Sequence, residues 1–306
     1  MRRNLSICII ALLSIISCSR FEVEQSHKYT FSIDGTLEEM AVGDETKASL
    51  AHTMRMTWAK GDAVSVVNLT KGKALGGTLT ADQKATVSTF SGTVTGDIDN
   101  GDVLALIYPN LGFSQEQPFT TASVDFSTQD GTANNAKFCA VAKITADVSD
   151  GNFVAAETHF FMKSSMLNAT LADLSYSSAI TSISFPGLYS GINLSINSTN
   201  DDIVLSGTTG AITLSPTGKT STTGTIGLYI GFGGAPSVSA RRTISVNCGD
   251  EIYESTMTNS ALNAGAFYSL SVGAFEKKSS TNGFTFNYDD SEMGDGGTVV
   301  IDGSSE

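Results

Sequence analysis

Histidine is the side chain that most often serves as a general base or a zinc ligand, and the chain has three, His27, His52 and His159. None stands in a metal-ligand spacing, and neither a Gly-x-Ser-x-Gly nor a His-Glu-x-x-His motif occurs. His159 lies in a strand-like run, Thr-His-Phe-Phe, where a structural or exposed position is expected. We therefore expect no catalytic residues, no cofactor and no enzymatic activity.

Two other segments contain residue types that could bind a ligand. Residues 231–236 (GFGGAP) resemble a phosphate loop in their glycines, but no helix pattern and no Lys-Ser/Thr pair follow, which favours a hairpin loop. An acidic run near the C-terminus offers oxygen ligands for Ca²⁺ but lacks the alternate spacing of an EF-hand loop. We expect it to be a solvated acidic tail that holds no metal; its members are Asp289, Asp290, Glu292 and Asp295.

Composition narrows the class of protein. The 306 residues include 18 Lys and Arg against 31 Asp and Glu, a formal net charge of −13. Nucleic acid is not an expected partner, because its phosphates attract basic surfaces. A hydrophobic content of 41% is enough to form a packed core.

The elements that must position any site read as β-strands. From Phe31 to Val272, short runs rich in Val, Ile, Thr, Phe and Tyr are interrupted by Gly, Asn and Asp every 8 to 12 residues or so, which predicts an all-β sandwich. Alternation of Met56 and Trp58 predicts one such strand. At roughly 150 residues per domain the length indicates two domains, with one long β domain as the alternative.

The polar run before a new strand at Ile180 places the boundary between the domains near residue 175. We expect a linker at 18–27, an N-terminal sandwich at 28–175, a C-terminal sandwich at 176–275 and a tail at 276–306 that contains two strand-like runs.

The first 17 residues read as a secretory signal. Arg2 and Arg3 precede an apolar run that is shorter than the roughly 18 residues of a membrane-spanning helix. The run ends in Ile-Ile-Ser17-Cys18, which resembles a bacterial lipobox. That resemblance implies cleavage between Ser17 and Cys18, and attachment of acyl chains such as palmitate to Cys18. The alternative is an ordinary signal peptide in which Cys18 has no role.

Cysteine usage excludes a disulfide framework. Cys8 leaves with the signal and Cys18 would carry lipid, so Cys139 and Cys248 remain. Both lie in apolar surroundings, and we expect buried free thiols, with a single bridge between them as the alternative.

The order of several motifs resembles the fimbrillin family, the lipoprotein pilins of type V pili. They are MTWAKGDAVSVVN at 56–68, STFSGTV at 88–94, GDVLALIYPN at 101–110 and ALNAGAFYSLSV at 261–272. The resemblance implies two tandem transthyretin-like β-sandwiches. It also implies assembly in which a protease removes an N-terminal segment with the first strand, and a neighbouring subunit's strand fills the vacated place.

Mapped onto this chain, the displaced strand is 28–33, with Tyr29, Phe31 and Ile33 on one face. The processing site is Lys47, where the family more often has Arg. The donor strand is the run with Phe284, Phe286 and Tyr288, and the run with Val299 and Ile301 has the same alternation. The alternative is that these segments are edge strands of their own subunit or a dangling tail.

The resemblance thus implies a structural subunit of a cell-surface fimbrium that serves adhesion, attached to the outer membrane by its lipid, with other pilus subunits as partners. Two alternatives remain open: a non-polymerising fimbrial anchor, and a surface lipoprotein that binds glycans. The only tryptophan, Trp58, is expected in the core rather than on a sugar platform.

Overall fold

The computed structural model describes residues 27–42, 56–133, 136–149, 151–154, 157–175, 178–197, 199–216, 223–234, 240–259, 262, 264–278, 283–286 and 299–302. In these residues the regular elements are β-strands, so the expected all-β class is confirmed. The described part contains no helix with the length and apolar character needed to cross a membrane. The signal segment, Cys18 and Lys47 lie outside the described residues.

The N-terminal half is built on a sheet that closes on itself. Its path runs β1, β15, β12, β8, β3, β6 and β7, and β7 pairs again with β1. The strands of this sheet are β1 (His27–Leu37), β3 (Ala63–Asn68), β4 (Lys73–Ala74), β5 (Gly76–Gly77), β6 (Leu79–Ala81), β7 (Val87–Gly96), β8 (Val103–Tyr108), β9 (Gln117–Pro118), β12 (Ala140–Thr145), β13 (Val148–Ser149), β14 (Asn152–Val154) and β15 (Thr158–Met162).

The C-terminal half has two sheets. One has the order β11-β18-β17-β20-β21-β23 with β10 beside β17, and the other has the order β19-β16-β22-β2. Their strands are β2 (Ala41–Val42), β10 (Ala122–Asp125), β11 (Thr128–Gln129), β16 (Ser165–Ser175), β17 (Ile180–Asn197), β18 (Asp202–Leu214), β19 (Thr223–Phe232), β20 (Ala240–Cys248), β21 (Glu251–Asn259), β22 (Ala266–Val272) and β23 (Glu276–Lys278). A separate hairpin of β24 (Gly283–Phe286) and β25 (Val299–Asp302) follows.

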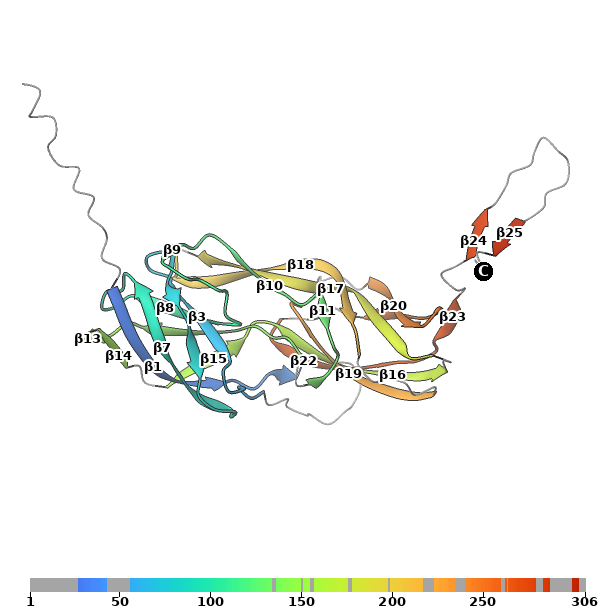
Figure 1. The fold of residues 1–306 in the computed structure, drawn as a ribbon, viewed down its shortest axis with the longest axis horizontal. Helices are drawn as coiled ribbons and strands as arrows, with labels where there is room; N and C mark the ends of the chain where they lie inside the picture. The colour runs from blue at the N-terminus through green and yellow to red at the C-terminus, as the bar shows by residue number, and fades with distance from the viewer. Residues whose placement is uncertain are drawn as a thin grey trace, which may run out of the picture.

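Pairing along the chain connects the two halves. β10 and β11 leave the N-terminal half to pair with β17 and β18, and β16 pairs with β19 and β22. One cluster of buried side chains therefore includes Val67 and Ile107 from the N-terminal half together with strands of the C-terminal half. The molecule is elongated, with the hairpin of β24 and β25 beyond the C-terminal half (Figure 1).

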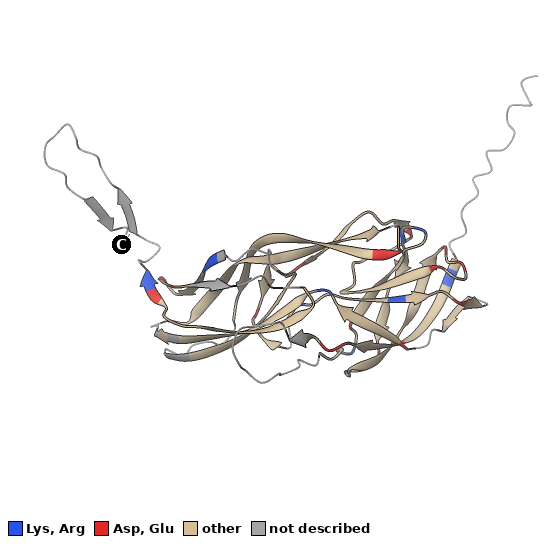
Figure 2. Ribbon diagram, turned by 180° about the vertical axis from the view of Figure 1, so that it is seen from behind, with Lys and Arg blue, Asp and Glu red and all other residues tan. Residues whose placement is uncertain are grey.

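Strand alternation explains how these sheets bury their inner faces. In β20, Ile244, Val246 and Cys248 are buried while the residues between them are half-buried. Charged residues lie mainly at strand ends and connections, which leaves long uncharged stretches along the strands (Figure 2). The segment of Met56 and Trp58 differs from expectation, because both side chains are buried although residues 56–59 form no strand.

Candidate functional site: the first strand and its groove

β1 has backbone neighbours on both of its edges. It runs antiparallel to β7 from His27 to Thr36, and its other edge pairs in parallel with β14 at Thr30–Ser32 and with β15 at Gly35–Leu37. We call the place between β7 and the β14–β15 pair, which β1 fills, the β1 groove. Because both edges of β1 are paired, its loss would leave two rows of unpaired backbone N–H and C=O groups.

The inner face of β1 belongs to the hydrophobic core of the N-terminal half. Tyr29, Phe31, Ile33 and Leu37 are between 0% and 8% exposed, whereas Thr30, Ser32 and Asp34 are exposed on the outer face. The Phe31 ring stacks on that of Phe153 with centroids 4.4 Å apart. This strand is therefore a part of the core.

Gly35 occupies the most crowded position on this face. A Cβ atom there would lie 2.8 Å from Phe160 Cε2 and 3.0 Å from the ring of Phe90. Trp58 donates a hydrogen bond from Nε1 to the Gly35 carbonyl oxygen at 3.0 Å, and its ring contacts Phe90 and Phe160 edge-on at 4.8 and 5.0 Å. The β1 groove therefore accepts large side chains at the positions of Tyr29, Phe31 and Ile33, and only glycine at that of Gly35.

Polar contacts on the outer face fix the register of β1. Thr89 on β7 donates from its hydroxyl to the Asp34 carboxylate at 2.6 Å. On the other edge the Thr36 hydroxyl donates to Glu157 at 2.7 Å. His159, which lies at the exposed position expected for it, pairs through Nδ1 with Glu38.

A charged turn supports the beginning of β1. Lys71 Nζ lies 2.9, 2.8 and 3.4 Å from carboxylate oxygens of Asp97, Asp99 and Asp102. The hydrogen bond from Lys71 holds the pKa of Asp97 below its ordinary value. Tyr29 donates its hydroxyl proton to the carbonyl of Ile98 in the same turn, at 3.2 Å. Within the described ranges, no cluster of His, Cys, Asp or Glu side chains has an arrangement that would hold a metal ion.

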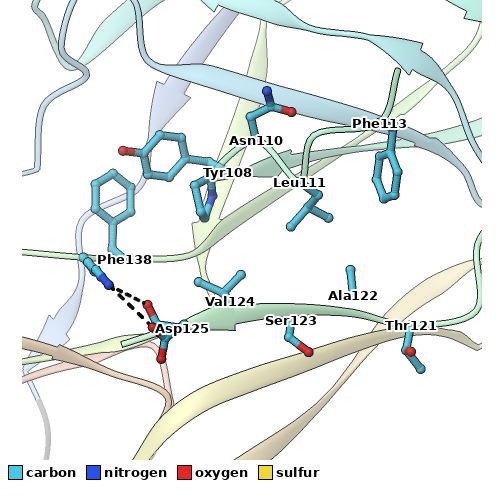
Figure 3. Close-up of a pocket in the computed structure, with 12 residues that line it drawn as sticks. Tyr108, Asn110, Leu111, Phe113, Thr121, Ala122, Ser123, Val124, Asp125 and Phe138 are labelled. Carbon is cyan, nitrogen blue, oxygen red and sulfur yellow. Dashed lines mark hydrogen bonds and ion pairs between the residues drawn. The ribbon is translucent and has the colours of Figure 1, made fainter. Parts of the chain in front are cut away.

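A second hollow, of about 610 Å³, lies between the connection after β8 and the strand β10. The side chains of Leu111 and Phe113 point into it from one side, and those of Ala122 and Val124 from the other (Figure 3).

Most of the polar side chains around this hollow already have partners. Ser65 donates to the Asn110 side-chain oxygen, and Ser123 donates to Asn193. Tyr108 donates to Asp62, and Lys137 donates to the backbone carbonyl of Asp125. A sugar would find few free donors or acceptors here, so the hollow does not favour glycan binding.

Cys139 and Cys248 are buried free thiols, as expected. Burial raises the pKa of Cys139 to about 12 and that of Cys248 to about 11, so both stay protonated at neutral pH.

The structure brings together some of the residues singled out in the sequence. Tyr29, Phe31 and Ile33 share the inner face of β1. Phe284 and Phe286 lie in β24, opposite Ile301 and Val299 of β25. Other residues singled out in the sequence lie outside the described part of the chain; they are Ser17, Cys18, Lys47, His52, Tyr288 and the acidic residues Asp289, Asp290, Glu292 and Asp295.

Gly35 was not singled out from the sequence, although it determines what the groove accepts. In the sequence, the one sign that other side chains approach the backbone closely here is a glycine at an inward position of an alternating strand.

No protein-family model matches the chain, and no curated protein matches it. Among solved structures, the chain is similar to a proposed cell adhesion protein of Bacteroides ovatus, with 16% identity and a TM-score of 0.48 over 81% of this chain and 95% of that one. It is also similar to one from Parabacteroides distasonis, with 10% identity and a TM-score of 0.41 over 82% and 90%. A third is the tip fimbrial protein Mfa3 of Porphyromonas gingivalis with a C-terminal truncation, with 9% identity and a TM-score of 0.35 over 82% and 98%.

Fimbrial and cell adhesion proteins are what the fimbrillin resemblance leads one to expect. Because the TM-scores are below 0.5, a function for this chain has to be argued from its own residues.

Proposed function

We propose that this chain is a fimbrillin-like structural subunit of a cell-surface pilus that serves adhesion. Subunits join when proteolysis removes the N-terminal strand and a strand of a neighbouring subunit takes its place. The observation that carries the proposal is the position of β1, the first described strand of the chain, which is paired on both edges and buried on its inner face.

Cleavage at Lys47 would separate β1 and β2 from the rest of the chain, since both precede this residue. Non-covalent contacts alone would then hold them. Fully burying a large apolar side chain contributes about 1.5 to 3 kcal/mol, so the four inner side chains of β1 contribute roughly 6 to 12 kcal/mol. A typical domain is stable by only about 5 to 15 kcal/mol, so the groove requires an occupant.

An added strand meets that requirement directly. It pairs with the free backbone groups of β7, β14 and β15, and it buries alternate side chains against the core. The same interaction repeated from one subunit to the next produces a fibre, because each copy offers a groove and donates a strand.

The first residues give the proposed route to the surface. The lipobox-like Ser17-Cys18 would direct export and acylation of Cys18, and the precursor would be an outer-membrane lipoprotein before assembly. A subunit that keeps Cys18 and β1 would instead act as a fimbrial anchor. This anchor role is the alternative within the same proposal.

Limited digestion tests the proposal. The purified chain from Ser19 onward is treated with a trypsin-like protease that cleaves only after lysine, because Arg55 also lies between β2 and β3 in the sequence, and oligomers are followed on gels with and without heating. We expect the cleaved chain to form a ladder that collapses on heating, and Lys47→Gln, treated in the same way, to remain a monomer. A chain that loses β1 and still remains a monomer contradicts the proposal.

A further inference from the structure

The β1 groove demands a particular sequence from any strand that fills it. Large apolar side chains fit at the positions of Phe31 and Ile33, and only glycine fits at that of Gly35. Between Ile33 and Gly35, an outward carboxylate at the position of Asp34 accepts the hydrogen bond from the Thr89 hydroxyl.

The same pattern occurs once more in the chain. Ile-Asp-Gly is found twice in the 306 residues, at 33–35 and at 301–303. The surrounding residues agree as well: residues 30–36 read TFSIDGT and residues 298–304 read TVVIDGS. Thr, Ile, Asp and Gly are identical, the inward Phe and the outward Ser are each replaced by Val, and the hydroxyl after Gly is kept as Ser.

We propose that the strand of a second copy that replaces β1 is residues 298–304, with Val299, Ile301 and Gly303 at the positions of Phe31, Ile33 and Gly35. This inference rests on the proposed function and names the donor within it. Asp302 then accepts the hydrogen bond of Thr89, and Ser304 takes the place of Thr36, whose hydroxyl donates to Glu157. Thr298, Gly303 and Ser304 are placed by sequence alone, since they lie outside the described residues.

The other strand-like run of the tail does not fit the same groove. If Phe284 and Phe286 take the positions of Tyr29 and Phe31, Asp290 falls at the position of Gly35. If they are moved two residues further along the groove, Tyr288 falls there instead. Neither residue is a glycine, and the rings of Phe90 and Phe160 leave no room for a Cβ atom. The fit therefore assigns the donor to the last strand-like run, although the aromatic run has the larger side chains.

Placing residues 298–304 in the β1 groove also requires the hairpin of β24 and β25 to open. β25 pairs with β24, Phe284 lying opposite Ile301, whereas a strand in the β1 groove is paired on both edges. β25 therefore exchanges β24 for β7 and the β14–β15 pair when it enters. The hairpin lies beyond the C-terminal half, away from β1, as a donor for a neighbouring copy requires (Figure 1).

Matched glycine variants of the whole chain test this assignment. Gly303→Leu places a side chain against Phe90 and Phe160, and we expect it to reduce the yield of heat-sensitive oligomers after cleavage by roughly tenfold or more. Gly297→Leu is the control, because residue 297 falls at the position of Tyr29, which accepts a large side chain. It is expected to polymerise as the parent does. Gly297 precedes β25 in the sequence and Gly303 follows it, so neither belongs to the two halves. Circular dichroism of the uncleaved variants checks that each is folded.

A cross-link reports the register itself. Asp34 lies opposite Thr89, so Asp302→Cys in one copy and Thr89→Cys in another should form a disulfide-linked dimer under mild oxidation, only after cleavage. Asp289→Cys in place of Asp302→Cys is the comparison, because Asp289 falls at the position of Asp34 when Phe284 and Phe286 take those of Tyr29 and Phe31.

The results of these experiments support or overturn the assignment of residues 298–304 as the donor strand. Loss of polymer in Gly303→Leu with the Asp302–Thr89 cross-link supports the assignment. A Gly303→Leu chain that polymerises like the parent, or a cross-link from Asp289→Cys alone, overturns the assignment and leaves strand exchange intact. A cleaved parent chain that remains a monomer overturns the proposed function and the assignment with it.

Discussion

Replacing Phe31 with alanine measures how strongly β1 is held by the core. Phe31 is fully buried and its ring stacks on Phe153 at 4.4 Å and 15°. A buried Phe→Ala change costs about 3 to 5 kcal/mol, which includes the cavity that it leaves. The free energy of unfolding of Phe31→Ala should fall by that amount, a large part of the roughly 5 to 15 kcal/mol expected of a domain.

Urea unfolding provides the assay, because the only tryptophan is buried in the same core. Trp58 is 0% exposed, so its emission reports loss of this core directly, and circular dichroism follows the strands as a whole. Ser32→Ala is the matched control: Ser32 is the outward neighbour of Phe31, and its change should remain within about 0.5 kcal/mol of the parent.

The same variant links stability to assembly. After cleavage, β1 bearing Phe31→Ala should leave the groove faster than the parent strand, and polymers should appear sooner. If Phe31→Ala lowers the unfolding free energy by no more than Ser32→Ala, then β1 is not part of the core in solution and the reasoning for strand exchange fails.

Two substitutions near the groove and one buried thiol of the other core cluster provide three further tests. Trp58→Phe removes the hydrogen bond to the carbonyl of Gly35, and we expect a loss of about 1 to 3 kcal/mol in urea unfolding followed by circular dichroism; an unchanged midpoint would contradict the contact. Cys139 should resist a thiol reagent such as DTNB until the chain unfolds. Because burial raises its pKa from 9.0 to about 12, its contribution to stability is complete below pH 9.0 and is lost as the pH rises through about 12. Lys71→Ala leaves three carboxylates without their cation, and we expect a loss of roughly 1 to 3 kcal/mol at neutral pH. The lowered pKa of Asp97 means that its contribution in the parent is present above the ordinary value of 3.8 and is lost at lower pH, so the difference between parent and variant should shrink in acid; a difference independent of pH would refute this.

Sequence patterns predicted the strands well where alternation is long. The run at 28–33 predicted one face for Tyr29, Phe31 and Ile33, and all three are buried together. Their displacement and the donor role of the tail stay predictions, as does the pair of transthyretin-like domains. The free state of Cys139 was predicted from its apolar surroundings and is confirmed.

Other features depend on partners that are distant in sequence. The crowding at Gly35 comes from Phe90 and Phe160, which no local pattern connects with β1. The four-residue strand β10 pairs with β17, although so short a strand gives almost no local signal of where it will pair. Trp58 shows the same dependence, because contacts with the surrounding rings bury it without a strand.

The mass of the mature chain in surface fibres tests the central claim most directly. Intact-protein mass spectrometry of sheared fibres distinguishes a chain that begins after Lys47 from one that retains β1. The strand-exchange account predicts the shorter chain in fibres, with β1 absent. Fibres built from chains that still carry β1 would contradict it, since the groove would then be filled by each subunit's own strand.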